Sequence, residues 1–329
     1  MGNQANSWPL FDLFSFARRG PGRRDHLSPG EIQQVARTVR RTPEVMVKVL
    51  PKSANTLAAV RKHLEYVGRR GELDLETDDG EWLRGMRVEE GLVEDWDLEL
   101  DEYRRKSDLT ATRGKEPARL VHKVIFSMPA RTPPDKVLAA VKNFAREEFA
   151  LKHRYVMALH TDTPQPHVHV VIKAVSEEGQ RLHIRKSTLR EWRSGFARHL
   201  SALGVPANAT ARYVRGETSI RRPDAIHRAN LRGESRYVRA RGEAVAAELA
   251  QGGLRAENAK ATLMRSRSEV RRTWLAVGEI LNRQGQFELA THIERFLDTM
   301  PPPRTEKEQI VFGIRNHARA LRGQDAISR

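Results

Sequence analysis

Residues 155–174 have the sequence YVMALHTDTPQPHVHVVIKA, and the order of apolar, turn and histidine residues in it decides the fold that we expect. Apolar runs at 155–159 and 168–172 contain the β-branched and aromatic residues that strands favour. Residues 163–166, TPQP, lie between the two runs and are typical of a turn. The stretch therefore predicts a β-hairpin.

Three histidines occupy matching places in this hairpin. Successive side chains of a strand point to opposite faces, so His167 and His169 share a face, and His160 ends the neighbouring strand. One histidine in a strand is usually satisfied by a backbone carbonyl, but three that converge can bind a divalent metal and leave positions open for a substrate oxygen. Asp162, in the turn, could orient a ligand histidine or assist a proton transfer.

The composition points to a polyanionic partner. The chain has 329 residues and a formal net charge of +16, which is typical of proteins that bind nucleic acid or an anionic membrane. We expect no membrane span, because there is no run of about 18 apolar residues. The absence of cysteine excludes disulfides and thiolate metal sites and fits a reducing cytoplasm. Any metal must therefore be bound by histidines and carboxylates.

The charge is unevenly distributed along the chain. Between Glu65 and Glu102 there are fifteen acidic residues and four arginines, a local charge of −11, so the rest carries +27. Such asymmetry is typical of a nucleic-acid protein with one acidic insert. We place this insert at 74–107 and expect its acidic face to point away from DNA.

Three motifs of the chain resemble those of a known family, and two of them carry the histidines and a tyrosine. His160-x-Asp162 followed by Pro166-His167-x-His169 resembles the third motif of conjugative relaxases of the MobA/VirD type, the mobilisation nucleases that nick and covalently hold one DNA strand at a transfer origin. Upstream, residues 63–73, HLEYVGRRGEL, resemble the first relaxase motif. The similarity is greatest to the branch that includes the border-nicking endonucleases of T-DNA transfer.

The resemblance implies a role for each matching residue. Tyr66, at the end of an expected helix, would attack a phosphodiester and remain as a 5′-phosphotyrosine, and His160, His167 and His169 would bind the metal. Asp162 would orient a ligand histidine or assist a proton transfer. Arg69 and Arg70 would hold the phosphates that flank the scissile one. The metal is expected to be Mg²⁺ or Mn²⁺, with Zn²⁺ as the alternative. Tyr103, in the polar insert, and Tyr155, in a strand, are the rival tyrosines.

Two further residues are DNA-binding candidates. Residues 121–128, VHKVIFSM, alternate like a strand and resemble the second relaxase motif, in which a serine after an aromatic residue places the DNA 3′ to the nick. This serine is Ser127, although a serine at a strand end is more often structural. Lys173 follows the histidine strand where a basic residue often stands, within reach of a phosphate.

The expected fold is of the α+β class. Strands are predicted at 45–50, 121–128, 155–160, 168–172 and 182–184, with helices between them, so we expect a five-stranded, mainly antiparallel sheet with helices on its face. The resemblance implies a palm-like sheet of the His-hydrophobic-His endonuclease type. We divide the chain into a basic, largely disordered leader (1–42), a catalytic domain (43–205) and a helical basic C-terminal region (206–329).

The C-terminal region contains a basic run. Residues 212–241 include nine arginines and three acidic residues, with Tyr213 and Tyr237 among them. Such a run can follow single-stranded DNA through phosphate contacts and base stacking, or be only a solvated helix face.

These expectations define partners and rivals. The resemblance implies single-stranded or supercoiled origin DNA as substrate, relaxosome accessory proteins and a type IV secretion coupling protein as partners, and the bacterial cytoplasm as location, with translocation alongside the DNA as an option. Rolling-circle replication initiators share the histidine strand, but in many of them the tyrosine follows the histidines; Tyr66 precedes them here. The alternatives are such an initiator or an inactive DNA-binding remnant. A protein that binds a membrane surface is the weakest alternative, because no continuous apolar face lies opposite the basic residues.

Overall fold

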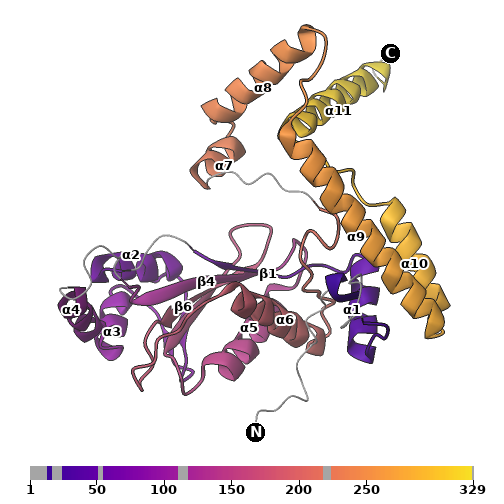
Figure 1. The fold of residues 1–329 in the computed structure, drawn as a ribbon. Helices are drawn as coiled ribbons and strands as arrows, with labels where there is room; N and C mark the ends of the chain where they lie inside the picture. Colours follow the sequence, from indigo (N-terminus) through magenta and orange to yellow (C-terminus); the bar gives the residue numbers. More distant parts are fainter. Residues whose placement is uncertain (1–12, 17–23, 51–54, 110–117, 218–223, 328–329) are drawn as a thin grey trace. The chain divides into compact units, whose positions relative to one another are not determined.

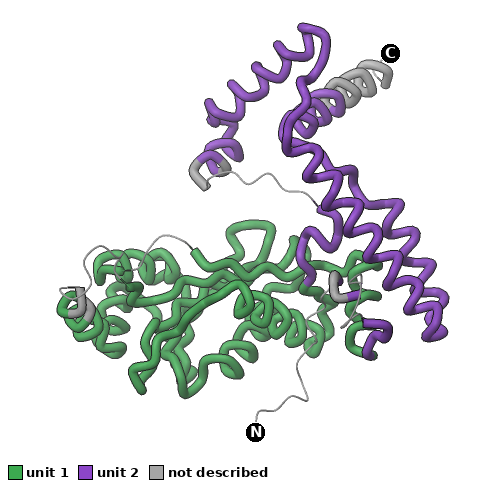
Figure 2. The backbone as a smooth tube through the Cα atoms, in the orientation of Figure 1, with its two compact units in different colours: residues 1–11, 29–209 green, residues 12–28, 210–329 purple. Residues whose placement is uncertain are grey.

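The structure, a computed structural model, describes residues 13–16, 24–50, 55–109, 118–217 and 224–327. The chain divides into two compact units, and each is described by itself (Figure 2). Among the described residues, unit 1 is drawn from 29–209. Unit 2 consists of the described residues up to 28 and of those from 210 onward.

Unit 1 is built on one six-stranded sheet with the order β1-β4-β6-β5-β2-β3. Figure 1 labels three of its strands, β1, β4 and β6. Every neighbouring pair is antiparallel. The strands are β1 Met46–Val49, β2 Leu75–Thr77, β3 Trp82–Leu83, β4 Val121–Ser127, β5 Tyr155–His160 and β6 His167–Lys173. The α+β class, the antiparallel sheet and the histidine hairpin β5–β6 are therefore confirmed.

The expected strand count of five is wrong. Leu182 donates its backbone N–H to Ala174, but residues 182–184 form no strand, and helix α6 (Lys186–Ala202) begins soon afterwards. Two strands that the sequence did not predict, β2 and β3, come from the acidic stretch, and β2 pairs with β5. Glu76 of β2 is buried and forms an ion pair at 2.7 Å with Lys142, which is distant in sequence and offsets part of the cost of burying the carboxylate.

One face of the sheet is covered by α5 (Pro134–Phe149) and α6 (Lys186–Ala202) (Figure 1). Alternate side chains of β4 and β6 point into this layer and pack against aromatic rings of the two helices. The rings meet mostly edge to face, the favoured geometry for aromatic pairs. They belong to Phe126, Phe144, Phe149, Trp192 and Phe196.

The opposite face carries α2 (Leu57–Val67), with α3 (Val88–Asp95) and α4 (Leu98–Leu109) beside it. Thr56 caps α2 by accepting a hydrogen bond from the N–H of Ala59. The apolar side of α2 packs on β5 and β6. The C-terminal end of α2 lies beside the histidines of β5 and β6, because His160 is hydrogen-bonded to the carbonyl of Val67 in the last turn of the helix.

Helix α1 (Pro29–Val39) belongs to unit 1, although it lies within the stretch 1–42 that we expected to be largely disordered. Asn208 fixes it through hydrogen bonds from its amide to Thr38 (3.1 Å) and Glu44 (3.0 Å). Of the leader expected to be disordered, residues 1–12 and 17–23 lie outside the described residues.

Unit 2 is helical, as predicted for the C-terminal region. Helices α9 (Asn258–Arg283) and α10 (Phe287–Asp298) pair through an apolar seam, and Trp274 donates its indole N–H to the carbonyl of Val214 at 2.8 Å. No helix in the described parts of the chain is long and apolar enough to cross a membrane. The remaining elements of unit 2 are η2 Leu13–Phe16, α7 Asp224–Leu231, α8 Arg236–Ala250 and α11 Glu306–Ile327.

A buried histidine makes the stability of unit 1 depend on pH. His122 of β4 donates a ring N–H to the carbonyl of Leu182 at 3.0 Å, and burial lowers its pKa to about 4. An unfolded histidine titrates near 6.5, so between these values the unfolded chain binds more protons and the free energy of unfolding falls as the pH falls.

We expect the variant His122→Gln, which keeps a donor for Leu182, to lose less stability than wild type between pH 7 and pH 4, by up to about 3 kcal/mol. Urea unfolding of both proteins at the two pH values measures this difference. Equal losses in the two proteins would show that His122 does not carry the effect.

Candidate active site

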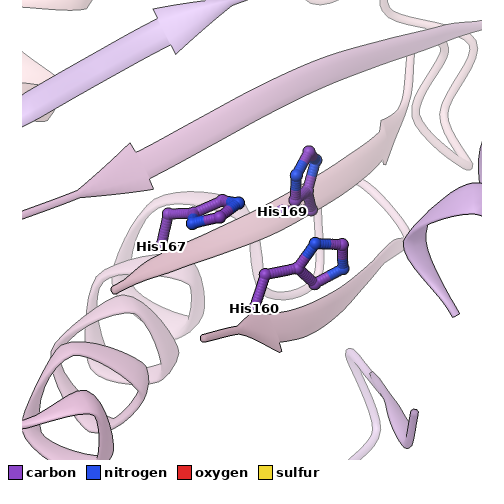
Figure 3. A group of neighbouring side chains, drawn as sticks. All are labelled: His160, His167 and His169. Carbon is purple, nitrogen blue, oxygen red and sulfur yellow. The ribbon is translucent and has the colours of Figure 1, made fainter. Parts of the chain in front are cut away.

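The histidine triad lies at one end of the β5–β6 hairpin. His160 and His167 are direct register partners, and His169 lies opposite Ala158 of β5 and Ile125 of β4. Figure 3 shows the three rings gathered on one face of the two strands. Their centroids are 4.5 to 5.3 Å apart, and one ligand nitrogen from each lies within 4.8 Å of the others. The three histidine side chains therefore converge on one face of the hairpin, as the alternation of side chains along a strand predicts.

Hydrogen bonds fix the tautomers of two of these histidines. A carbonyl only accepts and a guanidinium only donates. His160 therefore donates its Nε2–H to the carbonyl of Val67 (2.8 Å) and accepts at Nδ1 from Arg69 (3.2 Å). His167 donates its Nδ1–H to the carbonyl of Gln165 (3.1 Å), so its Nε2 keeps a lone pair. In its neutral form each ring thus offers one nitrogen lone pair.

The electrostatics of the triad fit a divalent metal. Burial, followed by the charges of His160 and His167, lowers the pKa of His169 to about 2, and burial also lowers the pKa of His160. Both imidazoles therefore stay neutral at pH 7, the state that binds metal. Among the described residues, nothing hydrogen-bonds the buried Nδ1 of His169, and such an unpaired atom is costly without a ligand.

Tyr66 lies beside the triad although it is distant in sequence. It is in the last turn of α2, is 49% exposed, and its ring centroid is 5.6 Å from that of His169 and 6.0 Å from that of His160. A reactive hydroxyl needs this combination of proximity to the site and access to solvent.

The rival tyrosines lie elsewhere in unit 1. Tyr103 is exposed on α4. Tyr155 is 2% exposed in the core beneath α5, where its ring contacts Phe149, and burial raises its pKa to about 12. A buried, protonated hydroxyl on that face is a poor nucleophile for a DNA strand.

The turn after Tyr66 separates its two arginines. Arg69 and Arg70 both have a left-handed backbone, with φ of 51° and 57°, which costs a non-glycine residue roughly 1 kcal/mol or more. This turn carries the guanidinium of Arg69 over the Tyr66 ring, at 4.9 Å, and into an ion pair with Asp162. Arg70 points outward with its side chain 87% exposed, and its ion pair with Glu65 is 3.7 Å long.

The other residues predicted for the site are Asp162, Ser127 and Lys173, and of these Lys173 lies away from the triad. Asp162 pairs with Arg69, and Arg69 in turn donates a hydrogen bond to His160. Ser127 is the register partner of His167, but it is buried. Lys173 ends β6 four residues beyond His169, about 13 Å along the strand, and pairs with Glu177.

The sequence motifs did not single out His63, which also contacts the site. Its ring stacks on Tyr66 at 6.1 Å and meets His169 edge to face at 6.1 Å. Burial, followed by the charges of Lys123 and His160, lowers its pKa to about 4. His63 could have been predicted from its spacing: it lies three residues before Tyr66, and residues three apart on a helix share a face.

We expect Gly71, which closes the turn after Tyr66, to be intolerant of a side chain. Its φ is +88°, and an added Cβ would lie 2.3 Å from the carbonyl oxygen of Gly85. Gly80 is a matched control, because its φ is +91° and a Cβ there would meet nothing within 4 Å. Both alanine variants should lose about 1 kcal/mol to backbone strain, and Gly71→Ala at least about 1 kcal/mol more from the collision.

Chemical unfolding of the two variants and of wild type measures these losses. An equal loss in Gly71→Ala and Gly80→Ala would contradict the close approach of the two turns.

Comparison with known proteins confirms the family resemblance for part of the chain. Residues 80–201 match the sequence model of the family described as "Relaxase: MobA/VirD2-like, nuclease domain". This range contains the histidine triad and begins after Tyr66. The placement of Tyr66 therefore rests on its geometry and on its own motif.

The curated relatives are T-DNA border endonucleases named VirD2. Those of Rhizobium rhizogenes and Agrobacterium fabrum (strain C58) are each 28% identical over 138 residues, which is 39% of this chain and 30% of the relative. That of Rhizobium radiobacter is 26% identical over 141 residues. The match thus spans under a third of the length of each relative.

One solved structure matches the chain with a low TM-score. It is titled "Molecular Basis of Vancomycin Resistance Transfer in Staphylococcus aureus", is 13% identical, and has a TM-score of 0.28 over 51% of this chain and 98% of that chain. At that TM-score the two folds are not shown to correspond.

Proposed function

We propose that this chain, similar over residues 80–201 to relaxase nuclease domains, nicks and rejoins one DNA strand at a transfer origin. The reaction would be metal-dependent, specific for site and strand, and would initiate transfer of a plasmid or mobile element. The observation that carries the proposal is the contact of the exposed Tyr66 ring with His160 and His169.

The proposed reaction is a transesterification. The Tyr66 oxygen attacks the scissile phosphorus and loses its proton, while the bond from phosphorus to the 3′ oxygen breaks and that oxygen takes up a proton. The products are a 5′-phosphotyrosine and a free 3′-hydroxyl. Because one ester replaces another, the bond energy is retained and the 3′-hydroxyl can later reverse the step.

The side chains around Tyr66 would support this chemistry. A divalent metal bound by the triad, Mg²⁺ or Mn²⁺ with Zn²⁺ as the alternative, would polarise the phosphate and stabilise charge on its oxygens. The guanidinium of Arg69, stacked on the Tyr66 ring, favours negative charge that develops on that ring. The Val67 carbonyl holds His160 in one tautomer and one orientation.

The proposed partner is single-stranded or supercoiled origin DNA. Arg70 is exposed one residue beyond Arg69 and is the better placed of the two to bind a phosphate from solution. The exposed arginines of α7 and α8 belong to unit 2 and are separate candidates for binding DNA phosphates; residues 218–223 of the basic run lie outside the described chain. The proposed protein partners are relaxosome accessory proteins and a type IV secretion coupling protein. The proposed location is the bacterial cytoplasm.

We expect Tyr66→Phe to abolish covalent attachment to DNA. The test uses a labelled single-stranded oligonucleotide with the transfer-origin sequence found beside this gene, incubated with Mn²⁺, Mg²⁺ or EDTA. Denaturing gels detect the protein–DNA adduct. The control Tyr103→Phe removes the hydroxyl of the exposed rival tyrosine and should form the adduct as wild type does.

An adduct that persists in Tyr66→Phe would assign the attack to another tyrosine. If wild type binds the oligonucleotide but forms no adduct with either metal, the chain is a DNA-binding remnant and the proposal is wrong.

The triad should bind a metal even without DNA. We expect His167→Ala to weaken Mn²⁺ binding by about tenfold or more, because one of three ligands is lost. Isothermal titration measures the affinity, and His183→Ala, which removes an exposed histidine outside the triad, should leave it unchanged. Equal affinities in wild type and His167→Ala would exclude the triad as the metal site.

A further inference from the structure

Arg69 uses a nitrogen that a metal ion would also need. The Nε2–H of His160 donates to the Val67 carbonyl, so Nδ1 carries the only free lone pair of this ring. Arg69 donates a hydrogen bond to that Nδ1 at 3.2 Å. A metal ion held by His160 requires the same lone pair, and one lone pair cannot serve both.

The ring cannot easily turn to offer its other nitrogen. His160 is 1% exposed, and Val67 is fully buried at the end of α2. A turned ring would lose the bond to the Val67 carbonyl inside the protein, and a buried polar group without a partner is costly. His160 is therefore held with Nδ1 as its ligand atom.

The guanidinium of Arg69 is itself anchored. It forms an ion pair with Asp162 and lies 4.9 Å from the Tyr66 ring, and the left-handed backbone of Arg69 aims the side chain inward. Its side chain is 29% exposed, against 87% for Arg70. The contact with His160 thus belongs to a built network, and Arg70 has no part in it.

We propose that Arg69 is a positioning residue that competes with the metal for Nδ1 of His160 and so sets the metal affinity of the triad. This inference rests on the metal site of the proposed function. A metal ion on Nδ1 of His160 would exclude the guanidinium from that nitrogen, while the ion pair with Asp162 would hold the Arg69 side chain beside Tyr66. There it can bind a phosphate of the incoming strand. Metal loading and DNA capture are then linked through one side chain.

The test is a titration of the full chain with Mn²⁺ by calorimetry, for wild type, Arg69→Ala, Arg69→Gly and Arg70→Ala. Loss of the competing hydrogen bond and of a nearby positive charge should tighten Mn²⁺ binding about tenfold in both Arg69 variants. Glycine accepts the left-handed backbone at residue 69, so Arg69→Gly tests the same loss without backbone strain. Arg70→Ala should bind Mn²⁺ with the same affinity as wild type, because the Arg70 side chain is exposed and pairs with Glu65.

The outcomes separate the inference from the proposed function. A gain in affinity cannot result from misfolding. If both Arg69 variants bind Mn²⁺ as wild type does, or more weakly, the competition is wrong while the metal site stands. If wild type binds no Mn²⁺, the metal site itself fails and the inference fails with it.

Discussion

The site depends on one hydrogen bond, from Nε2 of His160 to the carbonyl of Val67, at 2.8 Å. It joins the end of β5 to the last turn of α2 across 93 residues of sequence. Because Val67 follows Tyr66, the same bond that fixes the tautomer of His160 also places the tyrosine next to the triad. A metal ligand and the proposed nucleophile are thereby held in a common frame.

The site contains locally unfavourable features, and the packing of the sheet offsets their free-energy cost. Two consecutive arginines have left-handed backbones, and a buried histidine nitrogen has no hydrogen-bond partner among the described residues. Such features persist only where the surroundings enforce them, and they concentrate at functional sites. Here the apolar cores on both faces of the sheet supply the rigidity. The strained turn is useful because it directs Arg69 inward and Arg70 outward.

Local patterns predicted the parts of the site that follow from local geometry. Alternation along the strand placed His167 and His169 on one face, and helical spacing placed Tyr66 at a helix end. The parts that failed or were missed depend on distant partners. The buried Glu76 of β2 pairs with Lys142, and Asp162 pairs with Arg69; both partners are distant in sequence, so no spacing rule predicts them. Residues 182–184 have a strand-like composition but no neighbouring strand to pair with.

The most direct test is to locate the covalent bond. The protein–DNA adduct is trapped, its DNA is digested to a short remnant, and the peptides are sequenced by tandem mass spectrometry. The mechanism predicts that the nucleotide remnant is attached to Tyr66, the exposed tyrosine in contact with the triad. A remnant attached to Tyr103, Tyr155 or any other residue would contradict it.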